Sequence, residues 1–141
     1  MRLFFCLISL AGILSCGTAK KSNEKQYNNT DLTVELVCYR NEMPLSGGES
    51  YVVINITPSE KMINEQIKMT SIEATGANGT WKTTTFDQHE YGGFEHMGYQ
   101  NTARKFDSSI GATYDFKVVI QFASGKTQSY VVKNVPLQVV H

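Results

Sequence analysis

The strongest constraint on the fold is a two-residue alternation of apolar and polar side chains, and it is clearest near the C-terminus. In the segment GATYDFKVVIQF (residues 111–122), the apolar side chains that recur at every second position are Tyr114, Phe116, Val118, Ile120 and Phe122. Successive side chains of a β-strand point to opposite faces of a sheet, so this spacing predicts a strand buried on one face. Ser124 and Gly125 follow it and predict a hairpin to a further strand.

The same alternation, interrupted by turn residues, continues through residues 31–141. It predicts four earlier strands, at residues 32–40, 50–57, 67–74 and 80–88. Between them we expect a loop at 41–49, a helical turn that begins near Ser59 and a turn at 76–79. Trp81 is interpreted as an aromatic residue of the core or sheet surface and not as a platform for a ligand. The chain is therefore predicted to be all-β, with about seven strands.

One of these segments resembles a known family of domains. Residues 110–118, IGATYDFKV, resemble the penultimate strand of fibronectin type III and other immunoglobulin-like domains. Tyr114 matches the tyrosine whose hydroxyl bonds the backbone a few residues upstream, the tyrosine corner. The resemblance implies an immunoglobulin-like antiparallel β-sandwich over residues 31–141. The chain departs from the family because Trp81 lies outside the second strand and the disulfide between the sheets is absent.

The N-terminus has the pattern of an export signal. Arg2 is followed by an apolar run, LFFCLISLAGIL (residues 3–14), that is too short to span a membrane comfortably. The run ends in ILSCG (residues 13–17), which resembles the lipobox of bacterial lipoproteins, although Leu14 is bulkier than usual. The resemblance implies cleavage before Cys16 and attachment of lipid to its thiol. The alternative is an ordinary secretory leader in which the cysteine occurs by chance.

These features predict three parts: a lipoprotein signal peptide (1–15), a lipidated cysteine with a flexible tether (16–30) and the β-sandwich domain (31–141). The tether is polar and aperiodic. The whole chain resembles small immunoglobulin-like lipoproteins of Gram-negative envelopes. Gly17 is not the aspartate that retains some lipoproteins at the inner membrane. We therefore expect anchoring to the outer membrane, facing the periplasm.

The composition limits the partners and the use of cysteine. The formal net charge is zero, and no basic face is evident that would replace the counterions of a nucleic acid. Of the three cysteines, Cys6 leaves with the signal peptide and Cys16 becomes the anchor, so Cys38 cannot form an intrachain disulfide. Its alternating position predicts a small core residue. A nucleophilic role would require a base that is close only in space.

HEYGGFEH (residues 89–96) predicts a hairpin, because Gly92 and Gly93 suit a two-residue turn. Such a turn would place Tyr91 opposite Phe94, Glu90 opposite Glu95 and His89 opposite His96. Asp87 would share the face of the two histidines, and two imidazoles with one carboxylate suit zinc or copper. The candidate metal ligands are therefore Asp87, His89 and His96. The alternatives are a plain exposed hairpin and partner recognition by its aromatic tip.

We find no sequence motif of a hydrolase, metalloprotease or phosphate-binding loop, and we expect no enzymatic activity and no required cofactor. The leading interpretation is a non-catalytic module of the cell envelope that binds a protein or a glycan. The candidate contact residues are exposed apolar and aromatic side chains of two loops, namely Met43, Leu45, Tyr91 and Phe94. The competing interpretation is an envelope metal-binding protein that holds zinc or copper with Asp87, His89 and His96.

Overall fold

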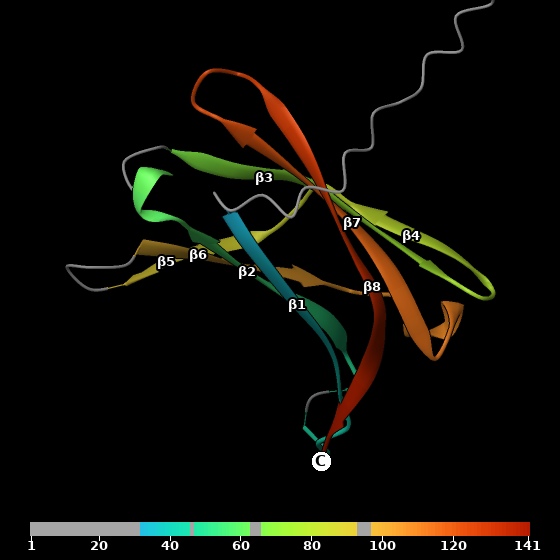
Figure 1. Ribbon diagram of the computed structural model, residues 1–141. Helices are drawn as coiled ribbons and strands as arrows, with labels where there is room; N and C mark the ends of the chain where they lie inside the picture. Colours follow the sequence, from blue (N-terminus) through green and yellow to red (C-terminus); the bar gives the residue numbers. More distant parts are fainter. Residues whose placement is uncertain (1–31, 46, 63–65, 93–96) are drawn as a thin grey trace, which may run out of the picture.

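The computed structural model describes residues 32–45, 47–62, 66–92 and 97–141 (Figure 1). These residues form eight strands and two 3₁₀ helices, in the order β1 Leu32–Asn41, β2 Ser50–Pro58, η1 Glu60–Met62, β3 Ile67–Gly76, β4 Gly79–Thr83, β5 Asp87–Gly92, β6 Met97–Arg104, η2 Ser108–Ile110, β7 Thr113–Phe122 and β8 Thr127–Val140. The all-β prediction is confirmed. One more strand is present than expected. The segment 80–88, which was predicted as one strand, is divided between β4, which ends at Thr83, and β5, which begins at Asp87.

The strands form one mixed sheet in the order β4-β3-β7-β8-β1-β2-β6-β5. The sheet curls so that two halves, β4-β3-β7-β8 and β1-β2-β6-β5, lie against each other (Figure 1). The second half has the A-B-E-D order of an immunoglobulin-like sandwich, and the first has the C′-C-F-G order. The predicted sandwich is therefore observed. It is not antiparallel throughout, because β1 and β8 pair in parallel from Cys38 with Leu137 to Asn41 with Val140.

The core between the halves is formed by the alternating apolar residues. In β2 the side chains of Val52, Ile54 and Ile56 are buried, as the alternation predicts. In β7 the buried side chains are the five predicted ones, Tyr114, Phe116, Val118, Ile120 and Phe122. Removing these apolar surfaces from water is the main stabilising contribution to such a fold.

The start of β7 carries the predicted tyrosine corner. The hydroxyl of Tyr114 lies 2.9 Å from the carbonyl oxygen of Ser108 and 2.7 Å from that of Gly111, and it donates to one of them at a time. The resulting loop packs against the turn between β3 and β4. A Cβ on Gly76 would lie 2.3 Å from the carbonyl oxygen of Ile110, so this close approach requires glycine.

The sandwich has two distinct ends, which we call proximal and distal. At the proximal end β1 begins with Leu32, which pairs with Pro58, and β5 and β6 meet there at Gly92 and Met97. At the distal end β1 finishes beside Val140, the last residue of β8. The connection between β1 and β2 (residues 42–49) therefore lies at the distal end, opposite the point where the chain enters the domain.

Candidate functional site

The hairpin formed by β5 and β6 has a different register from the one predicted. His89 pairs with Gln100 and Gly92 pairs with Met97, so the predicted opposition of His89 and His96 is wrong. The observed register differs from the predicted one by four residues, so the same side chains share a face in both and alternation alone does not distinguish them. Gly92 belongs to the strand ladder and not to a two-residue turn.

The three candidate metal ligands are not brought together by the described part of the chain. Asp87 is occupied by Arg104, whose Nε lies 3.0 Å from the carboxylate Oδ2. His89 is exposed, and His96 lies outside the described residues. Within residues 32–45, 47–62, 66–92 and 97–141, no three His, Cys, Asp or Glu side chains are grouped so that they could hold a metal ion. The zinc or copper assignment stays a prediction without its original geometric basis.

Three of the four candidate contact residues are described, and they lie at opposite ends of the domain. Met43 and Leu45 lie in the distal connection, and their side chains are 45% and 102% exposed. Tyr91 is next to the last residue of β5, at the proximal end, while Phe94 is not among the described residues. Met43 and Leu45 therefore lie at the end of the domain opposite Tyr91, which the sequence alone did not reveal.

Met43 and Leu45 share the distal end with a third exposed apolar residue. Val139 is 44% exposed, and the next residue, Val140, accepts a backbone hydrogen bond from the N–H of Glu42 at 2.9 Å. We call Met43, Leu45 and Val139 the distal apolar patch. An ion pair of 3.2 Å between Arg40 Nε and Glu42 Oε1 lies at the same end.

Cys38 is a core residue, as predicted. Its side chain is fully buried, and Sγ donates to the carbonyl oxygen of Pro136 at 3.1 Å. Burial raises the pKa of the Cys38 thiol to about 11. Since the thiolate is the reactive form, this environment opposes a nucleophilic role. Cys16 lies outside the described residues, so its lipidation stays a prediction.

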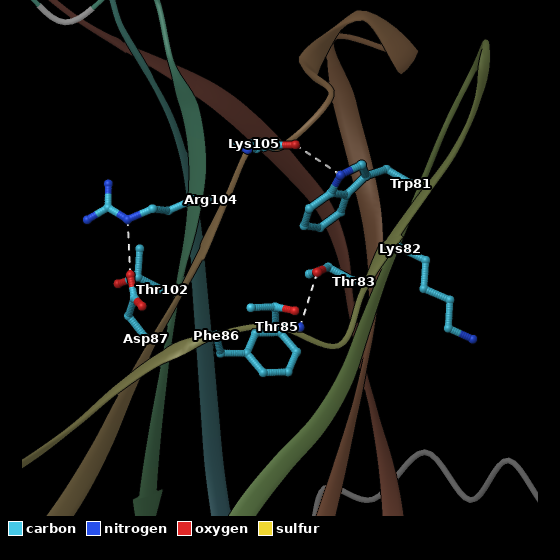
Figure 2. Close-up of a pocket in the computed structure, with 9 residues that line it drawn as sticks. All are labelled: Trp81, Lys82, Thr83, Thr85, Phe86, Asp87, Thr102, Arg104 and Lys105. Carbon is cyan, nitrogen blue, oxygen red and sulfur yellow. Dashed lines mark hydrogen bonds and ion pairs between the residues drawn. The ribbon is translucent and has the colours of Figure 1, made fainter.

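A cleft of about 370 Å³ opens at the side of the sandwich, where the chain passes from β4 in one half to β5 in the other (Figure 2). We call it the lateral cleft. Its lining comes from β4, the following connection, β5, and the end of β6 with the next residue: Trp81, Lys82, Thr83, Thr85, Phe86, Asp87, Thr102, Arg104 and Lys105. Its volume falls in the range of small-molecule sites, roughly 300 to 1,000 Å³.

Two fixed groups define opposite walls of the lateral cleft. The indole N–H of Trp81 donates to the carbonyl oxygen of Lys105 at 3.1 Å, and its ring packs edge-to-face on Phe106 with 5.1 Å between centroids. Arg104 donates from Nε to Asp87, and its Nη1 lies 3.8 Å from Glu49 Oε2. These two carboxylates raise the pKa of Arg104 above its usual value.

The remaining polar side chains of the cleft point in different directions. Figure 2 shows the side chain of Lys82 pointing away from the other lining residues, and its ammonium lies 3.9 Å from Glu73 Oε2. The hydroxyl of Thr83 accepts a hydrogen bond from the backbone N–H of Thr85 at 3.2 Å. The cleft thus offers rings, hydroxyls and one arginine–aspartate pair, which are groups suited to binding.

The lateral cleft was not predicted from the sequence. The packing prediction for Trp81 is confirmed by the contact with Phe106, but the same side chain also lines the opening. Phe86, Thr102 and Arg104 carry no local signal, because they come from separate segments that only the fold brings together. The segment TWKTTTFDQ, where the chain changes sheets, contains no glycine or proline that would have marked the break.

Comparison with known proteins adds no family assignment. No profile of a known protein family matches the chain, and the search of curated proteins also gave no match. In the part of the chain that the structure describes, no helix has the length and apolar character needed to cross a membrane.

Proposed function

We propose that this protein is a non-catalytic binding module of the cell envelope. In this proposal lipid on Cys16 holds it at the outer membrane, on the periplasmic side, and the distal apolar patch binds a partner protein. The lipobox-like sequence ILSCG and the polar tether before Leu32 support the anchor. The exposed side chains of the distal connection support the binding role.

The observation that carries the proposal is the placement of Leu45. Its side chain is completely exposed, in a loop at the end of the domain opposite Leu32, where the tether joins. β1 has 10 residues, and a rise of about 3.3 Å per residue separates its two ends by roughly 30 Å. A domain tethered through Leu32 would therefore hold the distal apolar patch away from the membrane.

Exposed apolar residues that gather at one place mark contact surfaces more often than scattered ones do. In the described residues the exposed large apolar side chains are Met43, Leu45, Val131 and Val139. Three of these four belong to the distal apolar patch. Val131 lies apart from it in the middle of β8 and provides a natural control position.

The anchor is tested by labelling cells with an alkyne fatty acid. The wild-type protein should incorporate the label and fractionate with the outer membrane, whereas Cys16→Ser should lose the label and become soluble. Mass spectrometry of the mature N-terminus provides the second measurement. An unmodified Cys16 in the wild type, or cleavage at another residue, contradicts the anchor.

The binding surface is tested by photo-crosslinking in native cells. A benzoylphenylalanine at position 45 should give a discrete adduct with one envelope protein, and the same probe at position 131 should not. The adduct at position 45 should disappear in Met43→Asp, which places a charge in the contact. Equal adducts at both positions, or none at position 45, contradict the proposed surface.

A further inference from the structure

The lateral cleft lies between the two halves of the sandwich at the side opposite the β1–β8 pairing. Thr85 and Phe86 of the connection between β4 and β5 line its floor, and the strands beside it, β4 and β5, are the outermost strands of the sheet. None of the three residues of the distal apolar patch lines the cleft. Its chemistry therefore calls for a separate explanation.

Two aromatic rings give the cleft flat apolar surfaces. Figure 2 shows the indole of Trp81 projecting from β4 into the opening, with the phenyl ring of Phe86 nearer the floor. Both side chains are half-buried, so part of each remains accessible. Trp81 is held by its hydrogen bond to Lys105 and its contact with Phe106. A ligand that stacks on it would therefore not have to order a mobile ring.

Hydrogen-bonding groups lie on both sides of the opening. Thr83 and Thr85 lie on the side of the rings, whereas Thr102, Arg104 and Asp87 lie together along β5 and β6, with side chains directed away from Trp81 (Figure 2). Thr83, Thr85 and Thr102 contribute hydroxyls that can donate and accept. Arg104 and Asp87 lie side by side and offer donors next to an acceptor oxygen. A pair of neighbouring hydroxyls on a ligand can satisfy both groups at once.

A sugar ring combines an apolar C–H face with a rim of hydroxyls, which matches rings flanked by threonines and an arginine–aspartate pair. We infer that the lateral cleft is a binding site for an uncharged saccharide. One ring of an oligosaccharide would stack on Trp81, and the hydroxyls of a neighbouring ring would bond Thr102, Arg104 and Asp87. This inference goes beyond the proposed function and depends on neither the lipid anchor nor the distal apolar patch.

Two other ligand classes fit less well. An anion would have to compete with the carboxylates of Asp87 and Glu49 for Arg104, and Lys82 already faces Glu73. A peptide added to a strand edge would need a long, uncharged edge. β4 has only 5 residues, and β5 carries the exposed side chains of Asp87, His89 and Glu90.

The single tryptophan of the chain makes the site directly measurable, since emission from Trp81 reports on the cleft alone. The full-length protein, in a detergent without a sugar headgroup, is titrated with N-acetylglucosamine trimer, mannotriose and galacturonic acid trimer. A saturable change in emission with a neutral trimer is the expected result. Saturation by the acidic trimer alone would overturn the choice of an uncharged ligand, and no change with any trimer would overturn the site.

A pair of arginine variants tests the residues. Arg104→Met should weaken binding of the neutral trimer by about tenfold or more, the effect of losing a hydrogen bond to a charged group. Arg40→Met is the matched control, because Arg40 is also exposed and ion-paired but is not among the residues that line the cleft. Equal affinities of the two variants would overturn the assignment. Leu45→Asp should leave saccharide binding unchanged, so this site and the proposed partner surface can fail separately.

Discussion

The two sides of the sandwich are closed in different ways. On one side, parallel pairing of β1 and β8 from Cys38 with Leu137 to Asn41 with Val140 joins the halves by backbone hydrogen bonds; we call this the closed seam. On the other side, β4 and β5 are not paired with each other, and the lateral cleft lies between them; we call this the open seam. Where the backbone does not join the halves, side chains must do so.

The residues behind each seam reflect this difference. Behind the closed seam lies the small apolar side chain of Cys38, whose thiol bonds the carbonyl of Pro136. Behind the open seam lie the aromatic ring of Phe106 and the buried amide of Asn101 in β6. Phe106 contacts both Trp81 and Tyr114, and so it connects the mouth of the cleft to the core.

The largest effect is expected at the open seam, from Phe106→Ala. The variant removes a buried ring that packs on three other aromatic side chains, which costs about 3 to 5 kcal/mol of unfolding free energy. Urea unfolding followed by circular dichroism measures it. Emission from Trp81 should also shift to longer wavelength, because its packing partner is lost.

Leu137→Ala is the control for that experiment at the closed seam. Leu137 is only partly buried, and backbone pairing with Cys38 persists in the variant, so a smaller loss is expected. If Leu137→Ala destabilises the domain as much as Phe106→Ala does, side chains support both seams equally and the contrast is wrong.

The second effect concerns the pH dependence of the closed seam. Burial raises the pKa of Cys38 from 9.0 to about 11 in the folded protein, so between these values the unfolded chain loses a proton more readily. Stability should therefore fall as pH rises from 9 to 11, by at most about 2 to 3 kcal/mol. Urea unfolding across this range, compared with Cys38→Ser, isolates the contribution from that of the tyrosines. If the unfolding free energy depends on pH in the same way in both proteins, the thiol ionises as readily in the folded protein as in the unfolded chain, which contradicts the prediction.

The smallest effect is expected from Asn101→Leu at the open seam. The amide of Asn101 is 1% exposed, and within the described residues neither its oxygen nor its nitrogen has a hydrogen-bond partner. Replacing an unpaired buried amide with an apolar side chain of similar size should stabilise the domain by about 1 kcal/mol. A thermal melt detects this change.

Gln100→Leu supplies the comparison from the opposite face of the same strand. Its Nε2 donates to Asn55 Oδ1 at 3.1 Å, so this variant loses a hydrogen bond and should not be stabilised. If both variants lower the melting temperature, the Asn101 amide has a hydrogen-bond partner in solution. The buried polar groups behind the open seam are then better satisfied by hydrogen bonds than the described contacts indicate.

The sequence predicted the strands because each one carries its own alternation. The buried residues of β2 and β7, the core position of Cys38 and the bond made by Tyr114 all follow from local spacing or from one resembling segment. The hairpin of β5 and β6 was predicted in the wrong register. Its symmetrical sequence suggested a turn at Gly92 and Gly93, whereas Gly92 pairs with Met97 in the ladder; the two registers share the same alternation, so local spacing could not separate them.

What the sequence determined by itself is the set of half-buried strands, since alternation with period two is a property of neighbours along the chain. Tertiary structure decided which strands lie side by side, that Met43 and Tyr91 belong to opposite ends, and that Trp81 meets Arg104 across a cleft. Those relations depend on how two sheet halves close over one core. No local pattern carries that information, because the contacts join residues from separate strands.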